Sequence, residues 1–371
     1  MSPITQKQTF KNLNIEKKQE KKKWKEQKLL KAAAEFKKEL EEDVSTNDNT
    51  KVEDVSPYED RVNGNLTHRI CPPYTISIAV PGSILDNAQT SELRTYLAGQ
   101  VARAASIYCV DEVIVFDDGS TQQDGVHRLG ENSCSQFAKL LQYLECPQYL
   151  RKHLFPLHKD LQYAGLLNPL DAPHHLRQTD DFPYREGVVS HHLVRQGKGS
   201  YVNVGLLRDV CIDKALTPGI RVTVNLLPQK KGTKKRYGVV VPPSQPRTEL
   251  GVYWGYSVRL AKSLSNVFAK APYQEGYDLT IGTSDKGSLL EDCDDSEFSN
   301  FKHILIVFGG LDGLESTLEC DENLSINNVS LLFDKYLNTC PNQGSRTIRT
   351  EEAILISLAQ ITAKLSKSVV Y

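Results

Sequence analysis

Three features are missing from this sequence, and each absence narrows what the chain can be. The eight cysteines include no CxxC pair, and no secretory signal stands ahead of them. We therefore expect reduced thiols in a cytosolic or nuclear protein. No stretch approaches the ~18 uninterrupted apolar residues of a membrane span, so we expect a soluble chain with no membrane partner.

Net charge is almost absent, because 45 Lys and Arg oppose 46 Asp and Glu and leave a formal charge of -1. The balance hides an uneven distribution, since residues 1–42 carry twelve Lys and seven Glu and have a charge of +5. This segment consists mostly of strong helix formers with few positions able to pack, which predicts a basic, solvated helical tail. Residues 43–73 are rich in Ser, Thr, Asn, Asp and Pro and are predicted to be a linker.

Residues 74–118 follow the pattern of a strand, a helix and a second strand. The run TISIAV is a short β-branched segment closed by Pro81 and Gly82, as expected of a buried parallel strand. An amphipathic stretch over 91–105 predicts a helix, and the run VIVF before Asp117 and Asp118 predicts the second strand. Such units imply a parallel sheet with right-handed crossovers.

The remainder of the chain changes its pattern twice. A helix is expected over 133–150, followed by a long irregular connection over 156–185. Residues 187–246 show short alternating runs between turn residues, which predicts a small antiparallel β-barrel. Strand-like runs return near Leu279 and from Ile304, and a helix is expected from Glu351 to about Lys367. We therefore predict an α/β domain of residues 74–186 and 248–371, interrupted by a barrel at 187–247.

Three glycine-containing segments are candidates for a ligand site. Residues 282–287 and 308–313 follow predicted strands, where glycines let the backbone approach a ligand, although ordinary strand-to-helix turns would look the same. The third segment, CPNQGSRTIRTEE from Cys340, leads into the last helix. Thr350 is expected to cap that helix, and the acids after it favour the positive end of the helix dipole. A cap does not account for the glycine and two arginines before it.

These segments carry a family resemblance. The run PYTISIAVPGSILDNAQTSELRTYLAGQVARAASIYCVDEVIVFDDG, the turn FGGLDG and the loop NQGSRTIRTEEA together resemble the SPOUT class of RNA methyltransferases. The likeness is to the eukaryotic and archaeal subfamily with an OB-like insertion, and it covers residues 70–371. It implies an α/β fold with a C-terminal trefoil knot and S-adenosylmethionine held in the knot, mostly by backbone groups. The positions implied here are Thr283, Ser284, Gly309, Gly310, Asn342, Gly344, Thr347, Ile348, Arg349 and Thr350.

The resemblance also implies a catalytic arginine. The class carries it in a run similar to AxxARAAxxxxVDEVI, and Arg103 falls on that position, with Arg94 a weaker candidate on the same helix. A guanidinium is permanently charged and can hold a phosphate or the target base in line with the methyl group. The alternative is a solvated surface arginine on a helix.

The subfamily is similar to enzymes that modify N3 of uridine in large-subunit ribosomal RNA. No cysteine here stands in a motif for the nucleophile of C5 methylation, which favours a ring nitrogen. The class implies a homodimer. A noncatalytic RNA-binding scaffold that retains the knot, in ribosome assembly or at the mitotic spindle, is the main alternative. A Rossmann-type methyltransferase is disfavoured, because no GxGxG-like turn follows the first strand.

The predicted barrel carries a basic cluster on a hairpin, which suits a single-stranded RNA groove or merely a charged, solvated loop. Its members are Lys230, Lys231, Lys234, Lys235 and Arg236. The basic tail adds attraction to phosphates, serves as a nuclear address, or stays a solvated helix. The histidine pairs 174–175 and 191–192 lack spaced carboxylate or cysteine partners, so we expect no metal. The expected location is the nucleus, the nucleolus or the cytoplasm, and the family resemblance adds the spindle as an alternative.

Overall fold

The computed structural model describes residues 71–119, 129–192, 199–229 and 235–368, and these belong to one compact unit, Val62–Tyr371. The predicted helical tail, all but the last three residues of the predicted linker, and Lys230, Lys231 and Lys234 lie outside the described residues.

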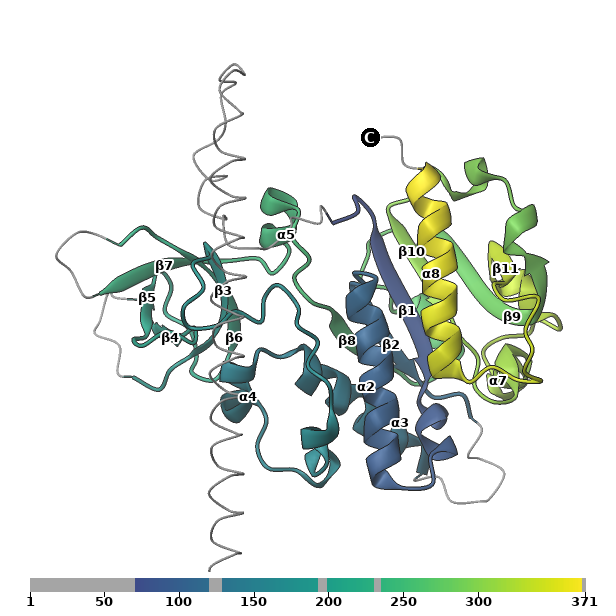
Figure 1. Ribbon diagram of the computed structural model, residues 1–371, viewed down its shortest axis with the longest axis horizontal. Helices are drawn as coiled ribbons and strands as arrows, with labels where there is room; N and C mark the ends of the chain where they lie inside the picture. Colours follow the sequence, from purple (N-terminus) through teal and green to yellow (C-terminus); the bar gives the residue numbers. More distant parts are fainter. Residues whose placement is uncertain (1–70, 120–128, 193–198, 230–234, 369–371) are drawn as a thin grey trace, which may run out of the picture. The chain divides into compact units, whose positions relative to one another are not determined.

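A six-stranded sheet lies at the centre of this unit, in the order β11-β9-β10-β1-β2-β8 (Figure 1). All its adjacent strands are parallel, which confirms the predicted sheet. The central strands are almost wholly buried, because helices cover both faces. The strands are β1 (Thr75–Pro81), β2 (Glu112–Phe116), β8 (Ser257–Ala261), β9 (Leu279–Leu289), β10 (His303–Val307) and β11 (Lys335–Asn338).

Helices pack on the two faces of the sheet. One face is covered by α2 (Ser91–Ile107), α3 (Leu129–Glu145) and α8 (Thr350–Ser368), and the other by α6 (Leu264–Ala269) and α7 (Gly313–Cys320). The remaining helices are α4 (Gln148–Leu154) and α5 (Gln245–Leu250), with 3₁₀ turns η2 (Gly82–Asn87), η4 (Lys159–Leu161), η5 (Ala164–Leu166), η6 (Leu290–Asp292), η7 (Asp295–Phe298) and η8 (Val329–Leu332).

The helix expected over 133–150 is wrong in its extent. It is two helices, because α3 ends at Glu145 and α4 begins at Gln148, after Pro147. Proline has no N–H to donate and disfavours a helical conformation in the residue before it, so the chain turns here. The turn directs α4 away from the sheet and onto the barrel.

The second part of the fold is a closed five-stranded barrel of strands β3 (Tyr184–Val189), β4 (Tyr201–Asn203), β5 (Val210–Ile212), β6 (Arg221–Leu226) and β7 (Arg236–Val241). Valine and isoleucine side chains fill its interior, as alternation along short strands predicts. One expectation needs correction: the barrel is not wholly antiparallel, since β5 and β7 pair in parallel. Its first strand also begins three residues before the predicted start at 187.

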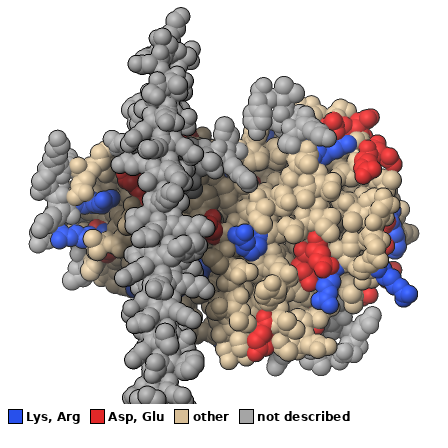
Figure 2. Space-filling view, viewed as in Figure 1, with Lys and Arg blue, Asp and Glu red and all other residues tan. Residues whose placement is uncertain are grey.

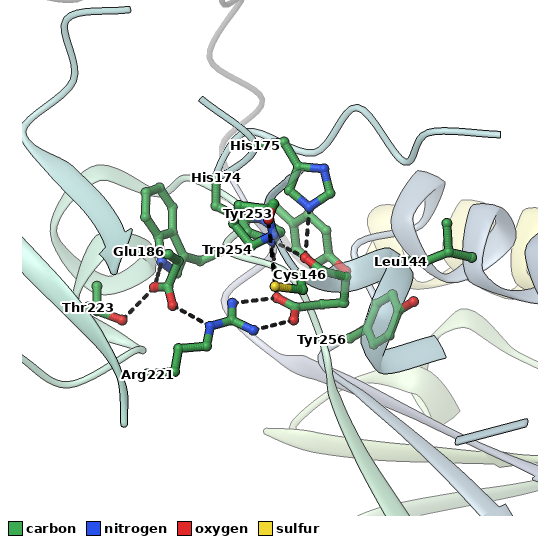
Figure 3. Close-up of polar contacts among 12 residues, drawn as sticks. Leu144, Cys146, His174, His175, Glu186, Arg221, Thr223, Tyr253, Trp254 and Tyr256 are labelled. Atoms are coloured by element: carbon green, nitrogen blue, oxygen red, sulfur yellow. Dashed lines mark hydrogen bonds and ion pairs between the residues drawn. The ribbon is translucent and has the colours of Figure 1, made fainter. Parts of the chain in front are cut away.

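Charged side chains join the barrel to the sheet domain (Figure 3). Arg221 of β6 donates to both carboxylate oxygens of Glu145 at the end of α3 (2.6 and 2.9 Å) and to Glu186 of β3 (2.7 Å). The other oxygen of Glu186 accepts hydrogen bonds from Trp254 Nε1 (2.7 Å) and Thr223 Oγ1 (2.6 Å). We call these five residues the interface cluster. They fix two barrel strands against the end of α3.

The carboxylate of Glu145 is ionised although it is buried. Burial raises its pKa, but hydrogen bonds from His174 and Arg221 outweigh that effect and lower the pKa to about 2. His174 and His175 both donate from Nε2 to the backbone carbonyl of Glu145 (2.8 and 2.7 Å). Burial lowers the pKa of His175 to about 4. This histidine pair therefore belongs to the interface.

Candidate active site

A cavity of about 690 Å³ lies at the carboxyl ends of β10 and β11, beside the point where the pairing of β9 with β11 is interrupted. Three chain segments wall it: residues 283–286, residues 308–313 and a stretch between 338 and 357. Eight of the ten predicted cofactor-binding residues line it, namely Thr283, Ser284, Gly309, Gly310, Thr347, Ile348, Arg349 and Thr350. Asn342 and Gly344 do not, and both are exposed. Segments separated along the sequence thus meet at one site.

The first wall is a bulge in a strand, which corrects the expectation of a turn after a strand. β11 pairs Tyr336 with Gly282 and the next residue, Leu337, with Ser288, so the residues between the two β9 positions are unpaired on this side. Such a bulge re-aims side chains at a sheet edge. It brings Thr283 to the cavity, where its hydroxyl donates to the carbonyl of Val307 (3.1 Å).

The second wall depends on glycine for packing. A Cβ at Gly309 would lie 2.7 Å from the carbonyl carbon of Gly313, where α7 begins. A Cβ at Gly310 would lie 3.2 Å from the carboxylate of Asp118. Gly313 itself has a φ of 77°, in the left-handed region that favours glycine. The helix start at α7 therefore approaches the end of β10 very closely.

The third wall is the segment before α8, and here one expectation is wrong. Thr350 is already the first residue of α8, and its hydroxyl donates to the carbonyl of Gly309 (3.0 Å) rather than capping the helix. The carboxylate of Glu352 accepts from the backbone N–H of Arg349 (3.1 Å) and so supplies the capping contact. The threonine instead ties the third wall to the second.

Charges of both signs line the cavity. The carboxylates are Asp285, Asp312, Glu315 and Glu351, and the cations are Lys286, Arg346 and Arg349. Lys286 and Glu315, both in the lining, form an ion pair (3.0 Å). Together with the backbone groups of the three walls, this lining can bind a ligand that carries both positive and negative groups.

Arg103 lines a smaller neighbouring cavity of about 250 Å³ between α2, α8 and residues 167–168. Its Nη1 donates to the carbonyls of Leu170 (2.6 Å) and Pro169 (3.3 Å), so the guanidinium is anchored. Glu351 lines both cavities, which marks the place where the two sites adjoin. Arg94 pairs with Asp86 (3.4 Å) and lines neither cavity.

The predicted basic hairpin is described only at Lys235, which is exposed, and at Arg236, the first residue of β7. The described residues hold no group of three or more His, Cys, Asp or Glu side chains placed for a metal ion. Within the same residues, no helix is both long and apolar enough to cross a membrane. None of the eight cysteines forms a disulfide bond.

A family model described as "Putative RNA methyltransferase" matches residues 75–361, which include the walls of the cavity and Arg103. The chain belongs to this RNA methyltransferase family. Among its relatives, the human "28S rRNA (uridine-N(3))-methyltransferase" is 59% identical over 297 residues, covering 78% of this chain and 78% of that protein. The Drosophila melanogaster protein of the same name is 50% identical over 383 residues, covering 99% of this chain and 75% of that protein.

Proposed function

We propose that this protein transfers a methyl group from S-adenosylmethionine to N3 of a uridine in large-subunit ribosomal RNA. The observation that carries the proposal is the convergence of three walls on one cavity in a member of an RNA methyltransferase family. Relatives at 59% and 50% identity bear the name of that activity. The cavity volume falls within the range of small-molecule sites.

The lining fits S-adenosylmethionine by charge. The molecule carries an amino group, a carboxylate and a sulfonium, and the lining offers four carboxylates, two guanidinium groups and one ammonium. Asp285, Asp312 and Glu351 can bind the positive groups, and Arg346 or Arg349 can bind the carboxylate. When bound, the cofactor supplies an electrophilic methyl group. The trefoil knot around residues 342–349 stays a prediction, and it would hold the same three walls together.

The acceptor uridine approaches through the Arg103 cavity in this proposal. A base there lies next to Glu351, at the boundary with the larger cavity. Arg103 is held in place by the carbonyl of Leu170, so a phosphate or a base oxygen meets a preorganised cation. Methyl transfer then needs alignment of the acceptor nitrogen and loss of its proton.

We further propose a homodimer that forms through α2 and α8. These helices leave Leu93, Tyr96, Ile107 and Leu355 exposed at between 44% and 53%, and Figure 2 shows few charged side chains on this face. Apolar side chains gathered on one face mark an interaction surface. A second copy seated there would add to the wall of the Arg103 cavity, which Tyr96, Ile107 and Leu355 line. Light scattering on the protein and on Tyr96→Glu tests this, and a wild-type monomer would contradict it.

In the decisive experiment, the protein is incubated with labelled S-adenosylmethionine and with total RNA from cells that lack this protein, and the position of the label in the RNA is then mapped. We expect 3-methyluridine at one position of the large-subunit RNA. Calorimetry on the same protein measures cofactor binding separately. Binding without transfer to any RNA would reject the proposed activity and support the noncatalytic scaffold.

A further inference from the structure

A second basic surface lies far along the chain from the predicted hairpin cluster. It is a groove of about 860 Å³ between the end of α3, α4 and residues 155–162, which we call the α4 groove. Arg151, Lys152 and Lys159 line it together with His158, and no carboxylate is among the lining residues. The nearby carboxylate of Asp160 pairs with Lys139 (2.7 Å) and His158 (3.1 Å). Lys152 and Lys159 are exposed, and no ion pair among the described residues involves either of them. In a chain of net charge -1, this local excess favours an anionic ligand.

The wall of the groove also offers flat stacking surfaces. Tyr143 and Phe155 meet edge to face with ring centroids 5.5 Å apart. The guanidinium of Arg151 lies over Tyr143, 4.5 Å from the ring centroid, and donates to the carbonyls of Cys146 (3.0 Å) and Leu144 (3.2 Å). Its plane is therefore held in one orientation. Unpaired RNA bases stack on aromatic rings and on arginine planes, whereas acidic peptides carry no such flat groups.

The position of the groove connects the barrel with the Arg103 cavity. α4 packs on the barrel, because Tyr149 donates to the carbonyl of Glu186 (2.9 Å) and Asn203 of β4 donates to His153 (3.3 Å). Figure 1 shows α4 between the barrel and the helices of the sheet domain. Leu161 lines the groove, and Leu167, on the same connecting segment, lines the Arg103 cavity. An RNA strand that lies in the groove can thus continue toward the proposed acceptor site.

We propose that the α4 groove binds single-stranded RNA beside the target uridine. Lys152 and Lys159 contact phosphates, and a flanking base stacks on the wall formed by Arg151, Tyr143 and Phe155. The inference rests on the proposed function for the identity of the RNA, and it assigns a binding site apart from the cofactor cavity.

The test compares two pairs of exposed lysines with the same change of charge. Lys152→Gln/Lys159→Gln removes the groove cations, and Lys262→Gln/Lys270→Gln is the matched control near α6, on the opposite face of the sheet. Affinity for a fluorescent, uridine-rich single-stranded RNA is measured over a range of salt concentrations. We expect the groove pair to raise Kd about tenfold and to reduce the salt slope by about 1.4, because each phosphate contact on a single strand contributes ~0.7. The control pair should leave both unchanged.

A second measurement identifies the stacking wall. Photocrosslinking with 4-thiouridine in the same RNA should label a peptide within residues 143–162 in the wild-type protein and less of it in the groove pair. Equal affinity and slope in the two pairs would overturn the proposal, as would crosslinks confined to other peptides. The proposal would also be overturned if Lys152→Gln/Lys159→Gln lost binding to poly-glutamate and kept its binding to RNA, because the groove would then be a site for an acidic protein.

The outcomes separate this inference from the proposed function. Wild-type protein that binds RNA through the groove yet methylates nothing keeps the groove and rejects the activity. If Lys152→Gln/Lys159→Gln methylates RNA with unchanged KM and kcat, the proposed RNA site in the α4 groove is rejected and the proposed activity stands. Calorimetry should show equal affinity for S-adenosylmethionine in both pairs and the wild type, which verifies that each variant is folded.

Discussion

Replacing Arg221 with methionine removes the cation that lies between Glu145 and Glu186. The two carboxylate side chains are 8% and 4% exposed, so neither can recover its hydration without opening the interface. Methionine is shorter than arginine, but it retains the packing of the aliphatic part of the side chain. The substitution therefore removes the charge and the three hydrogen bonds of the guanidinium and keeps most of the apolar packing.

The expected cost follows from the burial of the carboxylates. Removing one partner of a buried ion pair destabilises a protein by roughly 3–5 kcal/mol, because a charge stays buried without compensation. The lowered pKa of Glu145 reflects all the contacts of this carboxylate together, first the hydrogen bond from His174 and then those from Arg221. A folded pKa of about 2 against an ordinary 4.5 means stability that is complete above pH 4.5 and lost as the pH falls toward 2. That difference corresponds to about 3 kcal/mol for the contacts of His174 and Arg221 together, so Arg221 accounts for only part of it.

Urea unfolding at pH 7 measures the loss, with Trp254 fluorescence as the probe in a Trp24→Phe background. Trp254 donates to Glu186, so its emission reports directly on the interface. Arg208→Met, at an exposed barrel position, is the matched control and should cost less than 0.5 kcal/mol, roughly the limit for a surface site. Adding Glu145→Gln to Arg221→Met should restore part of the stability. A loss for Arg221→Met no larger than that of the control would refute the reasoning.

Three further predictions concern the cavity, the catalytic arginine and pH. Gly309→Ala should lower Tm and the affinity for S-adenosylmethionine, since its Cβ would lie 2.7 Å from the backbone at the start of α7. Gly310→Ala, whose Cβ would lie 3.2 Å from the Asp118 side chain, should lower Tm less, because a side chain moves aside more easily than a backbone. Equal Tm values would contradict this. Arg103→Ala should lower single-turnover methyl transfer about a hundredfold and cost about 1–3 kcal/mol of stability, because the Leu170 carbonyl loses a charged donor. Normal turnover in Arg103→Ala would show that Arg103 has only a structural role. His175→Asn should reduce the loss of stability as the pH falls from 6.5 to 4, because in this range the imidazole is protonated in the unfolded chain and neutral in the folded protein. An unchanged slope in urea unfolding would exclude His175 as the cause.

The sequence predicted the central strands because they are continuous apolar runs covered on both faces. It missed the edge strands β8 and β11, whose sequences SVRLA and KYLN mix charged and apolar residues. An edge strand has only one neighbouring strand, and the side chains of β8 are mostly not buried. The sequence of β8 therefore lacks the apolar periodicity by which strands are predicted. The break at Pro147 could have been predicted from the proline itself.

The candidate site was predicted from motifs and from a family resemblance, and its local geometry was not. The sequence of residues 283–287 does not predict a bulge, because the bulge depends on the register in which β11 pairs with β9. The interface cluster was missed for a similar reason, since Glu145 and Arg221 are 76 residues apart and neither stands in a motif. The adjacent histidines 174 and 175 were considered for metal binding alone, yet they donate to a backbone carbonyl.

The central strand pair has a consequence for how the protein is made. β1 is among the first described elements, yet its partner β10 follows so late that the contact between Thr75 and His303 spans 228 positions. During synthesis, one edge of β1 must wait unpaired while the barrel, β8 and β9 are translated. Pairings of such long range slow folding and leave apolar strand edges exposed in the meantime. One edge of β1 therefore stays exposed until β10 has left the ribosome, and the risk of aggregation is highest in that interval.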